Sequence, residues 1–101
     1  MTTWFVSRHS GAIDWIKSQN ITIDKFIEHI ELSRLKAGDR VIGTLPVNVV
    51  AQLCALDIEY WNLNLSLPFD ARGKELSAEQ LVRYGAHLQR YDVKKINSHD
   101  F

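Results

Sequence analysis

Hydrophobic and polar positions change in blocks along this chain, and each block predicts one element of secondary structure. Residues 2–7 (TTWFVS) are mostly β-branched or aromatic, with no glycine, proline or charge, and predict a buried strand. Apolar residues at helical spacing then predict a short helix from Ser10 to about Gln19. Residues 40–45 (RVIGTL) predict a second buried strand, and Pro46 suits the first position of the helix that follows.

Two further segments carry strand signals of different quality. Residues 21–30 (ITIDKFIEHI) fit the spacing of a helix, but their β-branched content also allows a strand at 25–30. We favour the strand, and the helix stays open as the alternative. Residues 58–67 (IEYWNLNLSL) alternate between polar and apolar side chains, which predicts a strand with one polar face.

The end of the chain predicts a helix and then a tail. Ser77 and Gln80 resemble a capping box. The helix that they open would present four residues on one face: Leu81, Tyr84, Gly85 and Leu88. With 101 residues the chain has the length of one domain, which we place at residues 1–93, with 94–101 (KKINSHDF) as a frayed C-terminal tail. Alternating strands and helices favour an α/β fold, in which helices flank a mostly parallel sheet.

Charge and composition narrow the class of function. Twelve basic and twelve acidic side chains give a formal net charge of zero, which argues against a protein that coats long DNA or RNA. A small anionic ligand stays possible, since it needs only a few donors. No apolar run approaches the roughly 18 residues that span a membrane, and we find no export signal, so we expect a cytoplasmic protein. Cys54 is the only cysteine, which excludes an internal disulfide and a multi-cysteine zinc site.

Two polar clusters follow predicted strands and precede predicted helices. One is residues 7–11 (SRHSG), and the other is residues 43–48 (GTLPVN). In a parallel α/β sheet, ligands bind outside the carboxyl ends of the strands, where helix N-termini present unpaired amides. We therefore expect both clusters at one ligand-binding edge.

The residue types in these clusters suit phosphate chemistry without a metal. The guanidinium of Arg8 matches a phosphate or a phosphorane, and Arg72 could add a second clamp. His9 can move a proton near neutral pH, and Ser7, Thr44 and Asn48 could donate hydrogen bonds. Together they suit cleavage of an RNA-type phosphodiester by the neighbouring ribose 2′-hydroxyl. The plainer alternative is that each of these side chains is solvated or stabilises a turn. For the polar face of the strand at 58–67, the alternatives are that it is solvated or that it lines a subunit contact.

Three strings give the chain a more specific likeness. TTWFVSRHSGAIDW, GDRVIGTLPVNVVAQLCA and LSLPFDARGKELSAEQL resemble a small protein family of type III CRISPR loci, the sixteenth of the Csx series. The resemblance implies a small Rossmann-like, CARF-like domain. It also implies a ring nuclease, an enzyme that opens cyclic tetra-adenylate and so ends antiviral signalling.

Combined with the resemblance, the sequence predicts a full set of site residues. The expected catalytic residues are Arg8 and His9, and neither a metal nor a cofactor is expected. The expected ligand-binding residues are Ser7, Ser10, Gly43, Thr44, Leu45, Pro46, Asn48 and Arg72. The expected partners are a cyclic oligoadenylate second messenger and a second copy of the chain, because a symmetric ring suits a twofold homodimer. Two alternatives stay open: a protein that binds the ring without cutting it, and a protein that attaches to a CRISPR effector.

Overall fold

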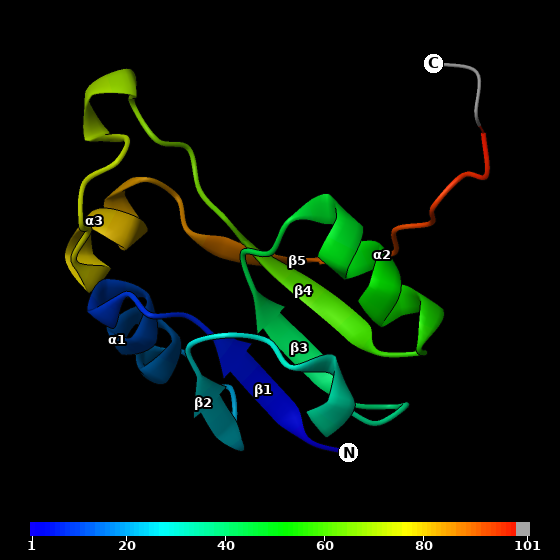
Figure 1. The fold of residues 1–101 in the computed structure, drawn as a ribbon. Helices are drawn as coiled ribbons and strands as arrows, with labels where there is room; N and C mark the ends of the chain where they lie inside the picture. Colours follow the sequence, from blue (N-terminus) through cyan, green and yellow to red (C-terminus); the bar gives the residue numbers. More distant parts are fainter. Residues whose placement is uncertain (99–101) are drawn as a thin grey trace.

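A five-stranded, mostly parallel sheet forms the centre of the protein in the computed structural model, which describes residues 1–98 (Figure 1). The strand order is β2-β1-β3-β4-β5, and only β5 runs antiparallel to its neighbour. The strands are β1 (Thr3–Val6), β2 (Lys25–Ile27), β3 (Arg40–Gly43), β4 (Glu59–Asn64) and β5 (His87–Tyr91). The α/β fold with a mostly parallel sheet is therefore confirmed.

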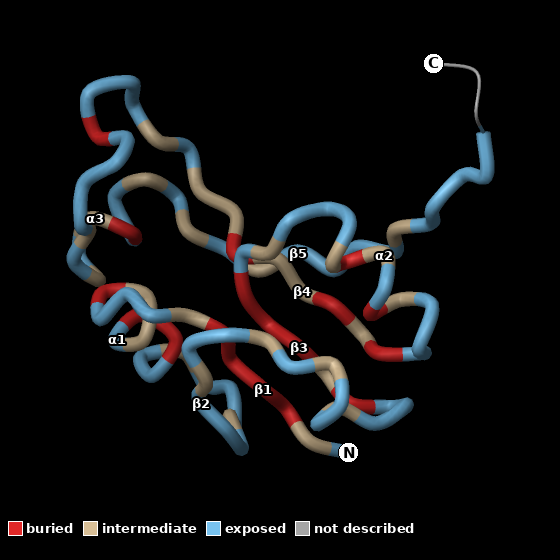
Figure 2. Tube along the Cα trace, in the orientation of Figure 1, coloured by how far each residue is buried: buried red, intermediate tan, exposed pale blue. Residues whose placement is uncertain are grey.

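Helices cover both faces of this sheet. They are α1 (Ser10–Ser18), α2 (Val47–Ala55) and α3 (Ala78–Arg83), with two short 3-10 helices, η1 (Leu32–Arg34) and η2 (Phe69–Ala71). Alternate residues of β1 point to opposite faces, so Trp4 packs in the cluster that contains Leu53 of α2, whereas Phe5 packs in the cluster that contains Ile16 of α1 and Leu81 of α3. The buried residues accordingly follow the inner strands and the inward sides of the helices (Figure 2).

The order of the strands places a switch point between β1 and β3. From β1 the chain passes through α1 to β2 on one side, and from β3 it passes through α2 to β4 on the other side. In the register of the sheet, Val6 at the end of β1 lies opposite Gly43 at the end of β3. Since ligands of open α/β sheets bind at such a switch point, the turns after β1 and β3 mark the place to look for a site.

Asp39, the residue before β3, holds the amino ends of the strands together. Its carboxylate is almost fully buried and accepts hydrogen bonds from the amide of Thr2 (3.0 Å), the amide of Lys36 (3.0 Å) and the indole Nε1 of Trp4 (3.2 Å). Burial by itself would raise the pKa of Asp39, but these three donors, helped by the positive N-terminus, bring the pKa below its ordinary value. The hydrogen bonds of the Asp39 carboxylate therefore connect the start of the chain to the loop before β3.

Strand bounds differ modestly from the sequence predictions. The ambiguous segment at residues 21–30 contains strand β2, so the strand interpretation is confirmed, but β2 covers only Lys25–Ile27. The strand predicted at residues 58–67 is shorter at both ends as β4. The residues beyond Asn64 leave the sheet because they continue into a projecting segment, which we call the arm (residues 65–77, between β4 and α3; Figure 1).

The prediction for the final helix was wrong in its second half. The capping box is present, since Ser77 Oγ accepts from the amide of Gln80 (3.2 Å) and Gln80 Oε1 accepts from the amide of Ser77 (2.9 Å). The helix ends at Arg83, however, and Leu88 lies on β5 rather than on the helix. Gly85 ends the helix with φ of +75°, and the amide of Ala86 donates to the carbonyl of Leu81, the pattern of a Schellman motif.

The ends of the described chain add two facts. No helix within residues 1–98 is long and apolar enough to cross a membrane. The last strand ends at Tyr91, and the division into a domain at 1–93 and a tail at 94–101 stays a prediction, with residues 99–101 lying outside the described residues.

Candidate functional site

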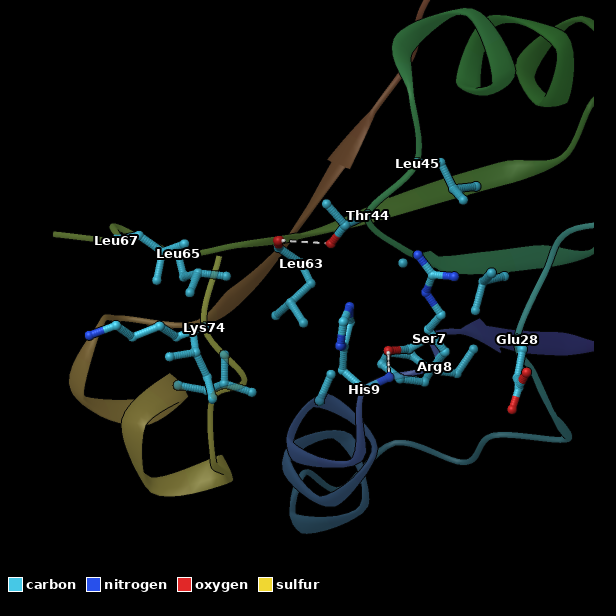
Figure 3. A pocket seen from close by; sticks show the side chains of 16 residues that line it. Ser7, Arg8, His9, Glu28, Thr44, Leu45, Leu63, Leu65, Leu67 and Lys74 are labelled. Carbon is cyan, nitrogen blue, oxygen red and sulfur yellow. Dashed lines mark hydrogen bonds between the residues drawn. The ribbon is translucent and has the colours of Figure 1, made fainter. Parts of the chain in front are cut away.

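A pocket of about 420 Å³ lies at the switch point, outside the carboxyl ends of β1 and β3. Six of the predicted site residues line it: Ser7, Arg8, His9, Gly43, Thr44 and Leu45. The turn after β1 and the turn after β3 therefore meet, as the register between Val6 and Gly43 requires. Figure 3 shows Arg8 and His9 extending from the end of β1 toward the Thr44 side of the pocket.

Arg8 is exposed at the mouth of this pocket. Within residues 1–98 its guanidinium forms no ion pair with a carboxylate. Glu28, which follows β2, lines the same pocket on the other side of Arg8 but does not come within ion-pair distance of it. The donors of Arg8 are therefore available to an anionic ligand, which is the condition for a phosphate clamp.

His9 occupies the cap position of α1, where its ring is held from outside the pocket. Its Nδ1 lies 3.1 Å and 3.2 Å from the two carboxylate oxygens of Glu75, a residue of the arm. Ser7 supports the same turn, because its Oγ accepts a hydrogen bond from the backbone amide of His9 (3.1 Å). The imidazole is thus fixed by one ring nitrogen, and within residues 1–98 its other nitrogen forms no hydrogen bond.

The turn after β3 is held by a buried tyrosine. The hydroxyl of Tyr60 accepts from the amide of Leu45 (3.0 Å) and lies 3.1 Å from the carbonyl of Gly43 and 2.6 Å from Oδ1 of Asn62, to which it can donate. Burial raises the pKa of Tyr60, and the Leu45 amide offsets only part of that rise. Tyr60 therefore stays a neutral hydroxyl that fixes the backbone on both sides of Thr44.

The predicted polar stripe of β4 continues this network away from the pocket. Asn62 Nδ2 donates to Oδ1 of Asn64 (2.6 Å), and Asn64 Nδ2 donates to the hydroxyl of Tyr91 on β5 (2.9 Å). The side chains of the stripe thus bond to one another and to β5, and a role in a subunit contact stays a prediction.

The opposite wall of the pocket is apolar. It consists of leucines from β4, the arm and α3: Leu63, Leu65, Leu67, Leu76 and Leu81. Lys74, also in the arm, adds a positive charge at the rim (Figure 3). A ligand with an anionic part and a flat apolar part would meet a matching surface for each.

Four predicted site residues do not line the pocket: Ser10, Pro46, Asn48 and Arg72. Ser10 begins α1, whereas Pro46 and Asn48 lie at the start of α2, and all three are exposed. Arg72 follows η2 in the arm and is also exposed.

Three residues of the site were not among the predicted site residues: Glu28, Lys74 and Glu75. Lys74 and Glu75 belong to the RGKE string that contains Arg72, so the string was relevant although a different member of it lines the pocket. Nothing in the sequence pointed to Glu28. Its position follows from the pairing of β2 with β1, in which Ile27 lies opposite Val6.

The described residues offer no ready metal centre. Within residues 1–98, no three His, Cys, Asp or Glu side chains are grouped closely enough to hold a metal ion. The expectation of metal-free chemistry stays a prediction for a chelator assay to decide.

Comparison with known proteins gives one match. Residues 4–94 match the model of a family described as "Putative CRISPR-associated protein (Cas_VVA1548)". Neither a curated protein nor a solved structure matches the chain significantly. The family match covers both polar turns, the arm and the five strands apart from Thr3, the first residue of β1. The chain therefore belongs to this family of CRISPR-associated proteins.

Proposed function

We propose that this protein is a ring nuclease that cleaves a cyclic oligoadenylate without a metal ion, and that cyclic tetra-adenylate is its main substrate. The observation that carries the proposal is the meeting of Arg8, His9 and Thr44 in one pocket at the switch point of the sheet. Membership of a CRISPR-associated family supports the coarser part of the proposal, and the cyclic oligoadenylate substrate comes from the resemblance of the three sequence strings to a family of type III CRISPR loci. The activity would end the signal by opening the ring.

The proposed reaction is an internal transfer of the phosphoryl group. The ribose 2′-hydroxyl attacks the adjacent phosphorus, a P–O2′ bond forms and the P–O5′ bond breaks, which leaves a cyclic 2′,3′-phosphate and a 5′-hydroxyl. Arg8 would stabilise the charge that develops on the phosphorane, and His9 would carry the proton of the attacking hydroxyl or deliver one to the leaving oxygen. The leucine wall would receive an adenine ring, which presents apolar faces.

The size of the pocket bears on the assembly. About 420 Å³ falls at the low end of pockets for small ligands, which span roughly 300–1,000 Å³. A ring of four nucleotides exceeds one such pocket, so we propose that two copies related by a twofold axis each present Arg8 and His9 to opposite sides of the ring. Each copy would then hold a part of the ligand.

Chromatography of reaction products tests the proposal. Purified protein is incubated with rings of three, four and six adenylates in the presence of a chelator, and the expected product is linear adenylate with a cyclic phosphate end. Arg8→Ala and His9→Ala should each reduce cleavage by roughly a hundredfold or more. Arg83→Ala and His29→Ala are matched controls, because both residues are exposed and neither lines the pocket.

Each of the other outcomes contradicts a defined part of the proposal. Tight binding without any product after long incubation would identify a protein that sequesters the ring. Absence of binding to all three rings would favour a protein that attaches to an effector. Full activity of both Arg8→Ala and His9→Ala would mean that the chemistry lies elsewhere in the chain.

A further inference from the structure

The contact between Glu75 and His9 joins two parts of the chain that are distant in sequence. His9 is the N-cap residue of α1, and Glu75 lies near the end of the arm, with both of its oxygens within 3.2 Å of Nδ1. Glu75 does not line the pocket, whereas His9 does. The carboxylate thus holds Nδ1 of the imidazole without itself lining the pocket.

Glu75 is placed there by close backbone packing rather than by the ion pair itself. The next residue, Leu76, brings its carbonyl against Gly11 in the first turn of α1, so closely that a Cβ on Gly11 would lie 1.8 Å from the Leu76 oxygen. The residue after that, Ser77, forms the capping box that starts α3. Fixed contacts therefore follow Glu75 along the chain and hold its backbone beside His9.

The chemistry of imidazole gives this contact a consequence. A carboxylate can only accept a hydrogen bond, so Glu75 selects the form of His9 that carries its proton on Nδ1. In the neutral ring, Nε2 is then an acceptor, which is the state required of a general base. Free histidine favours the opposite tautomer, in which Nε2 carries the proton and cannot accept another.

We infer that Glu75 is a positioning residue, which holds His9 in the tautomer and orientation with Nε2 available to the substrate hydroxyl. This inference rests on the proposed function, since His9 acts on a substrate only if the protein cleaves one. Glu75 touches no substrate atom in this scheme and acts through the imidazole alone.

The exposure of the pair separates this role from a structural one. The side chains of His9 and Glu75 are 62% and 61% exposed, and exposed ion pairs add little to stability because water screens them. Loss of Glu75 should therefore leave the melting temperature unchanged while it changes the ring of His9. Loss of a residue that matters only for folding would lower the melting temperature and leave the ring of His9 unchanged.

Nuclear magnetic resonance of the ring nitrogens tests the tautomer without any substrate. The ¹⁵N shifts of the full-length protein are recorded at mildly alkaline pH, and the signals of His9 are assigned by their loss in His9→Ala. We expect the Nδ1–H form in the wild type and a shift toward the Nε2–H form in Glu75→Ala. Glu79→Ala, which removes an exposed glutamate of α3, should leave the spectrum of His9 unchanged.

Steady-state cleavage of cyclic tetra-adenylate tests the consequence for the reaction. We expect Glu75→Ala to lower kcat by about tenfold or more with little change in KM, and Glu79→Ala to retain the wild-type kcat. A wild-type tautomer in Glu75→Ala would overturn the inference, and so would an altered tautomer with unchanged kcat. If the wild type cleaves no ring, the proposed function fails, and the ¹⁵N shifts still decide whether Glu75 orients His9.

Discussion

Replacement of Gly11 by alanine tests the contact that seats the arm against α1. The added Cβ would lie 1.8 Å from the carbonyl oxygen of Leu76, 2.8 Å from its carbonyl carbon and 3.2 Å from the carbonyl carbon of Ser77. All three neighbours are backbone atoms, so no side chain can rotate away. The arm would have to retreat by roughly 2 Å to restore ordinary van der Waals contact.

Two opposing effects set the expected size of the change. Forcing extra volume into a packed contact costs about 1–3 kcal/mol, and a rigid backbone neighbour places this case at the upper end. Alanine in place of glycine in a helix stabilises the folded state by about 1 kcal/mol, because alanine has the higher helix propensity. The free energy of unfolding should therefore fall by about 2 kcal/mol, which corresponds to a decrease in Tm of about 10 °C for a domain of this size.

Thermal unfolding followed by circular dichroism measures the effect. Ser10→Ala is the matched control, because Ser10 is the exposed neighbour in the same helical turn and the change adds no atom to the contact. A Tm of Gly11→Ala equal to or above that of Ser10→Ala would refute the close approach of Leu76 to α1. It would also remove the reason for Glu75 to lie beside His9.

Three other substitutions and a change of pH have defined outcomes. Asp39→Asn should lower the free energy of unfolding by about 2–4 kcal/mol in urea titrations, because the buried amide cannot accept all three hydrogen bonds of the carboxylate. The pKa of Asp39 lies below its ordinary value, and the pKa of Glu59 does so because its carboxylate accepts hydrogen bonds from Nε1 of Trp61 and Nε of Arg40. Stability should therefore be constant above about pH 5 and fall as the pH drops through those lowered values, with a smaller fall in Asp39→Asn. Glu28→Gln should tighten binding of an adenylate ring by about twofold to fivefold in calorimetry, since a negative charge leaves the pocket that would receive phosphates, and weaker binding would contradict an anion site. Tyr60→Phe should cost about 1–2 kcal/mol in urea titrations by freeing the amide of Leu45, whereas wild-type stability would show that the hydroxyl does not hold the turn.

The parts of the fold that sequence predicted correctly are those with one dominant signal. The run at residues 2–7 had no competing pattern and became β1, and the prolyl start at Pro46 marked α2. The last helix failed because Leu81 and Leu88 fit helical spacing while belonging to different elements. Gly85 was the available stop signal, since only glycine takes φ of +75° without strain.

The sequence predicted those parts of the candidate site that directly follow the ends of strands. Arg8 and Thr44 follow adjacent parallel strands, so the rule for α/β sheets brought them together. The positions of Glu28 and Glu75 at the site follow from contacts between segments that are distant in sequence, which no local pattern of residues predicts. The edge pairing of β2 placed the first, and the packing of Leu76 on Gly11 placed the second.

The sheet gives this small protein two chemically separate ends. The carboxylate of Asp39 fastens the amino ends of the strands, and the pocket opens at their carboxyl ends, about 13 Å away along a four-residue strand. A fluorophore or a surface linker attached at exposed Lys36, beside Asp39, would leave the mouth of the pocket facing solution. The protein thus keeps the buried carboxylate that ties its strands and the candidate pocket at opposite ends of one sheet.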